Sequence, residues 1–191
     1  MNTSNKLSGK RVAILATDGF EQSELTEPKK ALERAGATTE IISLRAGAIR
    51  GWAENHWGQS IAVDRSIDSA QVGDFDALVL PGGVMNPDKL RRNEKVLKFV
   101  RGFFEEGKPV GAICHGPWTL IDAGVVSGRR MTSYESIQTD LKNAGAQWAD
   151  EEVIVDNGLV TSRKPADLPR FNEKLIEEIG EGIHAGQRAA R

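Results

Sequence analysis

Short apolar runs alternate with longer amphipathic stretches along most of the chain. The run Arg11–Thr17 is apolar between its ends, as expected for a parallel strand that is buried on both faces. Residues Glu24–Ala35 then place leucines and alanines on one helical face, and Gly36 is a suitable stop signal. Thr38–Leu44 has the composition of a second strand. Together these three segments predict a βαβ unit.

The alternation continues to the end of the chain. Further strands are expected at Asp76–Leu80, Val110–Ile113, Val153–Val155 and Leu159–Ser162, and helices at Glu94–Glu106, Pro117–Ala123, Ile137–Ala144 and Leu168–Ile179. Asn157-Gly158 predicts a hairpin turn between the last two strands. Residues 46–69 are less regular, and we expect only a short strand there, at Ile61–Val63. This order predicts a doubly wound α/β sandwich with a mostly parallel sheet.

Composition narrows the class of protein. We expect the 191 residues to form one domain, with a core at about 10–179, a frayed polar start and a frayed Gly/Ala/Arg-rich end. The 25 basic and 27 acidic side chains give a net charge of -2, which argues against a dedicated nucleic-acid binder. One cysteine and three histidines offer no disulfide and no metal framework, so we expect no metal and no cofactor. With no long apolar run and no signal segment, we expect a cytoplasmic protein without membrane contact.

Three segments follow predicted strands and are expected to converge at one edge of the sheet. They are Asp18–Glu24, Pro81–Asp88 and Cys114–Pro117. In open α/β sheets, ligands bind beyond the carboxyl ends of the strands. The chemistry is therefore expected in these loops.

The only cysteine lies in the pattern of a nucleophile elbow. In Ala112-Ile-Cys114-His-Gly116 it is flanked by small residues between a predicted strand and a predicted helix. An elbow would place Cys114 at a helix N-terminus, where the helix dipole favours a thiolate and lowers the pKa of the thiol. The alternative is a buried, inert cysteine.

The neighbours of Cys114 offer a base and an oxyanion hole. The imidazole of His115 would assist the sulfur as a base or cation, and its backbone N–H, with that of Gly83, would hold an oxyanion. The alternatives are a structural histidine and, for Gly82-Gly83, an ordinary tight turn. No dinucleotide or phosphate-loop motif accompanies the two glycines.

Acidic and aromatic residues complete the candidate site. Next to the sulfur, Glu24 would have a raised pKa and act as a proton donor, with Glu21 beside it. The alternative for both carboxylates is favourable charge at a helix start. Trp52 and His56, together with Glu21 and Gly82, are candidates for a substrate pocket. For Trp52 and His56, a subunit contact and local packing of the segment are equally open interpretations.

These residues together resemble the ThiJ/PfpI family of the class-I glutamine-amidotransferase-like superfamily, most closely its PfpI-type intracellular protease or general-stress branch. The motifs that carry the resemblance are Asp18-Gly-Phe-Glu-Gln-Ser-Glu24, Leu80-Pro-Gly-Gly83, Ala112-Ile-Cys-His-Gly-Pro117, Asp156-Asn-Gly-Leu-Val-Thr-Ser-Arg163 and Asp167-Leu-Pro-Arg-Phe171. The resemblance implies a flavodoxin-like three-layer sandwich with Cys114 as the nucleophile on an elbow. It also implies that Glu24 hydrogen-bonds the thiol, that Glu21 is the second acidic position and that Gly83 supplies a backbone amide.

The resemblance extends to assembly. In PfpI-type peptidases a glutamate from a neighbouring subunit completes the Cys–His pair, and the matching position here holds Asp88, which is one methylene shorter. This implies a homo-oligomer, either a dimer or a hexamer.

The activities implied by the resemblance share one step. They are a peptidase, a glyoxalase or a deglycase, so the expected substrates are peptides, small carbonyl compounds or glycated adducts, attacked by the sulfur at an electrophilic carbon. The alternative is a redox-responsive stress sensor or chaperone that oxidises Cys114 without turnover.

Overall fold

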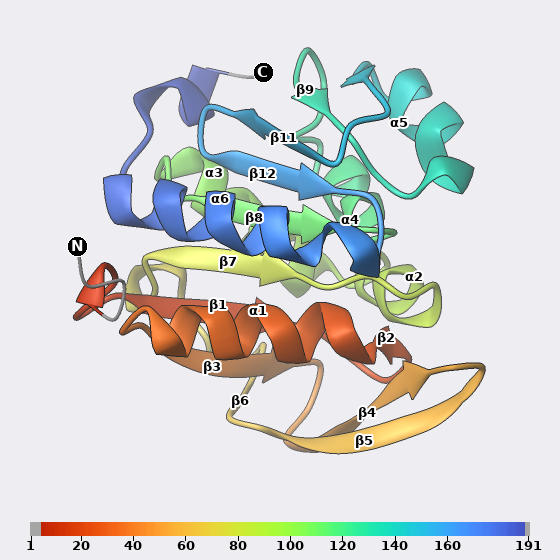
Figure 1. The fold of residues 1–191 in the computed structure, drawn as a ribbon. Coiled ribbons are helices and arrows are strands. Elements are labelled where there is room, and N and C mark those ends of the chain that lie inside the picture. Colours follow the sequence, from red (N-terminus) through yellow and green to blue (C-terminus); the bar gives the residue numbers. More distant parts are fainter. Residues whose placement is uncertain (1–4, 190–191) are drawn as a thin grey trace.

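A parallel sheet between two layers of helices is the main feature of the computed structural model, which describes residues 5–189 (Figure 1). Within those residues the sheet has seven strands in the order β11-β12-β8-β7-β1-β3-β6. Neighbouring strands pair in parallel except β11, which is antiparallel to β12. The strands are β1 (Arg11–Leu15), β3 (Thr38–Ser43), β6 (Arg65–Ser66), β7 (Ala77–Leu80), β8 (Val110–Ile113), β11 (Val153–Asp156) and β12 (Leu159–Ser162).

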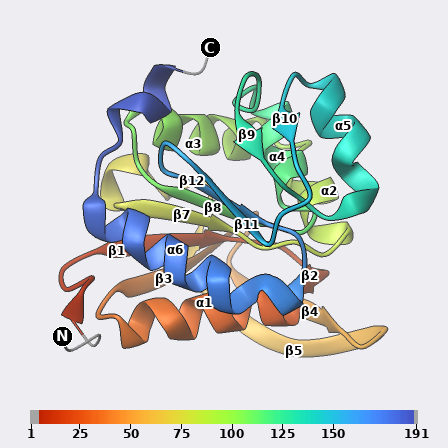
Figure 2. The ribbon, with the colours of Figure 1, turned by 45° about the horizontal axis from the view of Figure 1, so that its top comes forward.

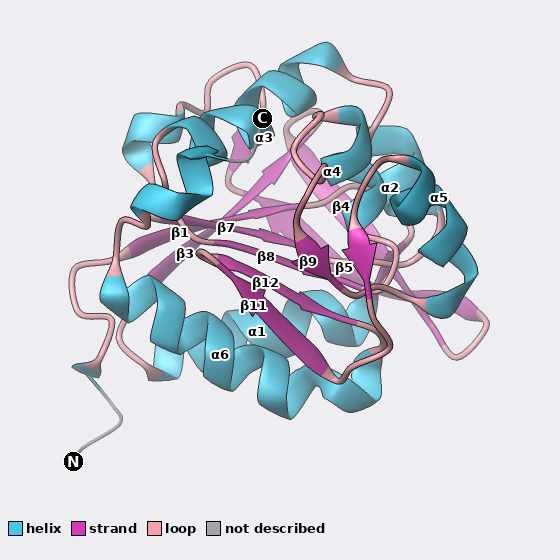
Figure 3. Cartoon of the chain, turned by 90° about the horizontal axis from the view of Figure 1, so that it is seen from above, coloured by secondary structure: helices cyan, strands magenta, loops and turns pink. Residues whose placement is uncertain are grey.

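The helices form a layer on each face of this sheet (Figure 3). Helices α1 and α6 cover one face, and α3, α4 and α5 lie on the other (Figure 3). Their bounds are α1 (Gln22–Arg34), α2 (Met85–Leu90), α3 (Glu94–Glu105), α4 (Pro117–Asp122), α5 (Gln138–Asn143) and α6 (Leu168–Glu181), with 3-10 turns η2 (Val72–Asp74), η3 (Glu135–Ile137), η4 (Pro165–Asp167) and η5 (Ala185–Ala189). The predicted flavodoxin-like α/β sandwich is confirmed.

The two helical layers explain why the central strands are continuously apolar. In β1, Val12 and Ile14 belong to the core cluster that packs with α1 and α6, whereas Ala13 and Leu15 belong to the cluster on the opposite face. Side chains of a strand alternate between faces, so a strand covered on both sides needs apolar residues at every position.

The segment we interpreted as irregular folds into a hairpin. Strands β4 (Gly47–Ala53) and β5 (His56–Val63) pair with each other, and β2 (Phe20–Glu21) pairs with β4. The expected strand at Ile61–Val63 is the end of β5. The two turn residues, Glu54 and Asn55, have φ of 48° and 68°, as a type I′ turn requires. Without a glycine, Glu-Asn does not signal that turn in a sequence, whereas Asn157-Gly158 does and its predicted hairpin is confirmed.

Short elements and the chain ends also differ from our predictions. Helix α2 and the paired strands β9 (Arg130–Met131) and β10 (Gln147–Trp148) lack an amphipathic repeat that would reveal them. Leu7 is fully buried and its N–H donates to Ala35 O at 2.8 Å, and Gln187 is buried where η5 packs near α3 (Figure 2). These two residues therefore pack against the core, while the outermost residues, 1–4 and 190–191, lie outside the described part, and the fraying expected of the chain ends stays a prediction.

Candidate active site

The three loops expected to carry the chemistry meet at the carboxyl ends of β1, β7 and β8 (Figure 1). Gly82 lies at the centre. Its N–H donates to Oε2 of Glu24 at 2.9 Å, and a Cβ on this residue would lie 2.5 Å from the Cβ of Cys114. Only a glycine therefore allows the loop after β7 to fit between the carboxyl group and the sulfur.

Cys114 forms the predicted elbow between β8 and α4. Its φ of 62° lies in the left-handed region, which a residue other than glycine seldom adopts. The turn is held from both sides, since Cys114 N donates to Ser162 O at 3.0 Å and Tyr134 N donates to Cys114 O at 2.9 Å. Gly116 is needed because a Cβ there would lie 2.6 Å from the carbonyl oxygen of Leu80.

Glu24 is a buried carboxyl group in the first turn of α1. It is fully inaccessible, and its Oε1 has no well-formed hydrogen bond among the described residues. Burial, followed by the charge of Glu21, raises the pKa of Glu24 to about 8. The N–H groups of Gly82 and Gly83 and the Cys114 thiol act in the opposite direction with smaller effect. Glu24 is therefore protonated at neutral pH, as expected for a proton donor.

The thiol of Cys114 differs from our expectation. Burial raises its pKa above the ordinary range, and the nearby Glu24 carboxyl raises it further. The backbone N–H groups of Gly83 and His115 lower it by less. The predicted lowering by a helix dipole is wrong, because α4 has six residues and begins with Pro117, which has no N–H. The resting sulfur is a thiol, and its activation requires a base.

His115 lies in position to be that base. Its Nδ1 is 3.2 Å from Sγ of Cys114, and its Nε2 is 3.1 Å from Oγ of Ser136. The ring stacks on Tyr134 with centroids 4.9 Å apart and meets the edge of Trp118 at 5.1 Å. Burial lowers the pKa of His115, so the imidazole is neutral and able to accept a proton.

The backbone amides of Gly83 and His115 are directed at the sulfur, where both lower the pKa of the thiol. Gly83 has φ of 75°, and a Cβ on it would lie 2.5 Å from Gly19 O. The loop after β7 thus depends on glycine at two successive positions. Two N–H donors beside a nucleophile form an arrangement that can hold a developing oxyanion.

With this geometry established, comparison with known proteins identifies the family. Residues 10–178 match the DJ-1/PfpI family. The chain belongs to the DJ-1/PfpI family. The resemblance noted in the sequence is confirmed, over nearly the same residues.

Two curated relatives and one solved structure show how the family is described. Protein/nucleic acid deglycase 2 of Escherichia coli (strain K12) is 45% identical over 173 residues, which are 90% of this chain and 98% of the relative. General stress protein 18 of Bacillus subtilis (strain 168) is 44% identical over 173 residues, which are 88% of this chain and 96% of the relative. The crystal structure of Drosophila melanogaster DJ-1beta is 30% identical with a TM-score of 0.81 and covers 90% of each chain.

Two residues of this DJ-1/PfpI site escaped the sequence analysis. Asn86 is fully buried, accepts a hydrogen bond from Thr17 N at 2.8 Å and donates to the carbonyls of Pro81 and Gly82 at 3.0 and 3.1 Å. It fastens the loop after β7 to the end of β1. Ser136 contacts His115 from a separate part of the chain, and no sequence motif includes it.

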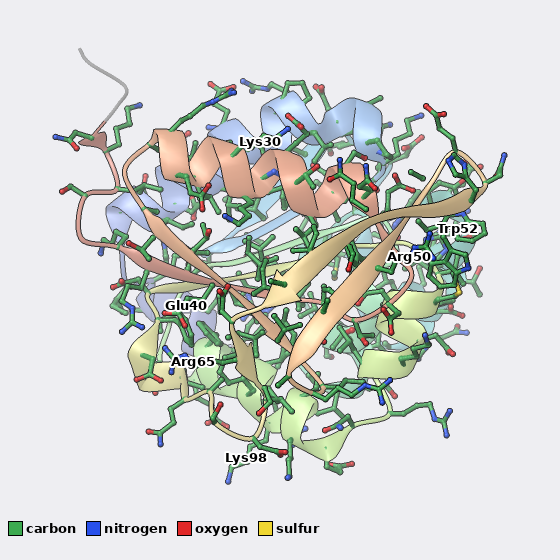
Figure 4. All side chains as sticks on the ribbon, turned by 90° about the horizontal axis from the view of Figure 1, so that it is seen from below. Lys30, Glu40, Arg50, Trp52, Arg65 and Lys98 are labelled. Carbon is green, nitrogen blue, oxygen red and sulfur yellow. The ribbon has the colours of Figure 1, made fainter. Side chains whose placement is uncertain are left out.

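Other predicted site residues lie away from the sulfur. Asp88 is exposed on α2, and within the described residues no hydrogen bond or ion pair joins it to Cys114 or His115. Trp52 lies towards the end of hairpin β4–β5 (Figure 4), where its ring meets the edge of Trp57 at 5.4 Å. His56 is exposed and its Nδ1 is 3.0 Å from Glu54 O.

A polar cavity of about 520 Å³ adjoins the site on the side of Glu21. It lies between the start of α1 and hairpin β4–β5, and its lining includes Glu21, Ser23 and Glu54. Gly82, Trp52 and His56, which we grouped with Glu21 as a pocket, do not line it. The link of these residues to substrate stays a prediction.

One cluster has the composition of metal ligands. Glu178, Glu181 and His184 bring one ligand atom each within 4.8 Å of one another at the end of α6. Nε2 of His184 lies 3.5 Å from the carboxyl group of Glu178 and 3.2 Å from its backbone carbonyl oxygen, and these contacts explain the proximity without a metal. Among the helices of residues 5–189, none is both long and apolar enough to cross a membrane.

Proposed function

We propose that this DJ-1/PfpI protein is a cysteine-dependent hydrolase or lyase of the stress response that acts on small carbonyl compounds and glycated adducts. The observation that carries the proposal is the position of Cys114 between a neutral base, His115, and a protonated acid, Glu24. Relatives named a deglycase and a general stress protein support the substrate class and the setting.

The first step is attack by the sulfur on a carbonyl carbon. Nδ1 of His115 takes the thiol proton while Sγ forms a bond to that carbon, and the electron pair of the C=O bond moves to the oxygen. Because the proton moves to an adjacent base, a thiol with a raised pKa still becomes a nucleophile in the transition state.

The second step stabilises the oxygen that gains charge. The N–H groups of Gly83 and His115 lie beside the sulfur and donate to this oxygen. The proton of Glu24 is available for it, since a pKa of about 8 permits both donation and recovery near neutral pH. For methylglyoxal, addition of water and an internal shift of hydrogen give lactate, so no external oxidant is required.

The burial of the sulfur favours small substrates. Cys114 is 7% exposed and His115 is likewise 7% exposed, so only a slim group such as an aldehyde or ketone carbon reaches Sγ without movement of the loops. The proposed substrates are methylglyoxal and its adducts with amino groups, thiols and nucleotides.

The test is turnover by matched variants. Wild type, Cys114→Ser and Glu24→Gln are assayed on methylglyoxal, on methylglyoxal-treated amino acids and nucleotides, and on a fluorescent casein. We expect turnover of the small carbonyl substrates that is lost in Cys114→Ser and reduced in Glu24→Gln. Full activity in the serine variant would exclude the proposal.

A peptidase is the second candidate, favoured by the hydrogen bond between Cys114 and His115. In that case Asp88 of a second copy would approach the pair, in a homo-oligomer that is a dimer or a hexamer. Val84 and Trp57 are 54% and 41% exposed, as side chains of a subunit contact are in the isolated chain. Light scattering that finds only monomer, together with unchanged turnover in Asp88→Asn, would exclude this candidate.

The non-catalytic sensor is the remaining alternative. It requires an accessible thiolate, which oxidises readily, whereas burial here raises the pKa of the thiol. Intact mass after mild peroxide separates the two: oxygen added to Cys114 in a protein without turnover would favour the sensor.

We also propose that the protein acts in the cytoplasm. A lone unpaired thiol at the reacting position keeps its function only where the surroundings are reducing. Fractionation of cells that express the tagged protein tests this location.

A further inference from the structure

Ser136 stands at the far side of the His115 ring from the sulfur. Its Oγ is 3.1 Å from Nε2, while Nδ1 is 3.2 Å from Sγ of Cys114. The imidazole thus bridges the thiol and the serine. A neutral imidazole carries one proton, so only one of these two nitrogens is an acceptor.

The surroundings of the sulfur decide which nitrogen that is. The backbone N–H groups of Gly83 and His115 both point to the sulfur as donors. Glu24 accepts the N–H of Gly82 on Oε2, and burial raises its pKa to about 8, so this carboxyl group is already protonated at neutral pH and does not take the thiol proton. Since the proposed mechanism has His115 take the S–H proton, its Nδ1, which lies 3.2 Å from Sγ, must be the nitrogen without a proton.

If Nδ1 carries no proton, Nε2 carries it, and the Nε2–H group needs a hydrogen-bond acceptor. Ser136 Oγ is in place to accept. The loop that carries this serine is fixed to the elbow, because Tyr134 N donates to Cys114 O at 2.9 Å and Ile137 is buried. Trp148 Nε1 also donates to Ser133 Oγ at 3.0 Å. The acceptor is thus held in the same rigid unit as the nucleophile.

We propose that Ser136 is a positioning residue that keeps the proton of His115 on Nε2 and so leaves Nδ1 free to take the proton of Cys114. This inference rests on the proposed function, since it concerns how the nucleophile is activated.

Ser136 acts again once the thiol proton has moved. The imidazolium then carries protons on both nitrogens, and Nε2–H keeps a hydrogen bond to Oγ of Ser136. A hydrogen bond to a charged group is stronger than one to a neutral group, so loss of this acceptor slows formation of the ion pair.

The first experiment is ¹⁵N NMR of the histidine side chains in the wild-type protein, with the signals of His115 assigned by comparison with His115→Gln. We expect Nδ1 to be the unprotonated nitrogen and Nε2 to carry the proton. The opposite tautomer in the wild type would overturn the proposal, whether or not any substrate is turned over.

The second experiment measures the rate of alkylation of Cys114 by iodoacetamide at neutral pH. We expect the rate to fall about 10-fold in Ser136→Ala, the size of effect of one hydrogen bond to a charged group, and to return to within about 2-fold of wild type in Ser136→Thr. Ser69→Ala is the control, since it likewise removes a hydrogen-bonded serine hydroxyl, which here donates to the carbonyl of Ser66 at 3.1 Å and lies far from the elbow in sequence.

The possible outcomes distinguish a failure of the role of Ser136 from a failure of the proposed function. A wild-type rate in Ser136→Ala, or a loss in Asp88→Asn that Ser136→Ala does not show, would overturn the role of Ser136. Correct tautomer and alkylation results in a protein without turnover on any carbonyl substrate would instead reject the proposed function and retain the activation of the thiol.

Discussion

Glu24 and Asp167 are both buried carboxyl groups near the starts of helices that lie side by side on one face of the sheet (Figure 1). Asp167, at the end of η4, accepts hydrogen bonds from the N, Nε and Nη2 atoms of Arg163 at 3.0, 2.9 and 3.0 Å. Glu24, in α1, accepts the backbone N–H of Gly82 at 2.9 Å. Asp167 thus has a charged partner, Arg163, on both of its oxygens, whereas Glu24 has none among the described residues.

The difference separates a structural carboxylate from a reactive one. Asp167 raises the pKa of Arg163 and locks the start of α6 to the end of β12, so its charge is used entirely within the fold. No cation of residues 5–189 pairs with Glu24, and burial raises its pKa to about 8. A buried group that its neighbours leave incompletely satisfied retains a proton to exchange, which is the property a catalytic acid requires.

The largest effect is expected for removal of Cys114, the nucleophile next to Glu24. In Cys114→Ala, turnover of methylglyoxal adducts falls at least about 1000-fold, because the bond-forming atom is removed. The measurement is kcat/KM, with near-ultraviolet circular dichroism to show that the fold is retained. A residual rate above a tenth of the wild-type rate would mean that the reaction does not take place at Cys114 and Glu24.

The second prediction uses the pKa of Glu24. Its folded-state pKa of about 8 lies above the ordinary value of 4.5, so the folded protein binds the proton more tightly than the unfolded chain. The stability that the protonated Glu24 contributes is therefore full below about pH 4.5 and is lost as the pH rises through about 8, by about 5 kcal/mol in total. We expect Glu24→Gln to remove this slope.

Urea unfolding of wild type and Glu24→Gln at pH 5 and pH 8.5 provides the measurement. Glu173→Gln, an exposed position on α6, is the control and should keep the wild-type slope. Equal slopes in wild type and Glu24→Gln would show that Glu24 is ionised in the folded protein and is as well partnered as Asp167.

A third prediction tests how closely the loop after β7 fits. In Gly82→Ala the new Cβ would lie 2.5 Å from both Cys114 Cβ and Oε2 of Glu24. We expect a loss of about 1–3 kcal/mol in the free energy of unfolding, together with reduced turnover. Gly73→Ala is the matched control, because nothing lies within 4 Å of a Cβ there. Equal free energies of unfolding of Gly82→Ala and Gly73→Ala would show that the space around Gly82 is not crowded.

The smallest effect is expected at the structural carboxylate. Asp167→Asn keeps the shape of the side chain but removes its charge, so Arg163 retains Asp150 at 2.8 Å as its ionic partner. We expect a loss of about 1–2 kcal/mol in stability and unchanged kcat per folded molecule. If kcat fell in step with stability, Asp167 would belong to the site and the contrast with Glu24 would fail.

Local signals predicted much of this molecule. The βαβ order and the hairpin at Asn157-Gly158 follow from short-range hydrophobic periodicity and turn chemistry. The loops that bring Glu24, Gly83 and Cys114 together follow from the geometry of parallel sheets. Hairpin β4–β5 was missed since its type I′ turn lacks glycine, and Ser136 was missed because its contact with His115 joins separate loops.

By itself the sequence determined the order of elements, the elbow that presents Cys114 and the glycines that let the loops approach it, because each depends on residues adjacent in the chain. Only the tertiary structure decided the protonation states of Cys114, Glu24 and His115. The pKa of a buried group depends on how much water the packed fold removes from it and on which donors replace that water. Those donors come from segments that only folding brings together.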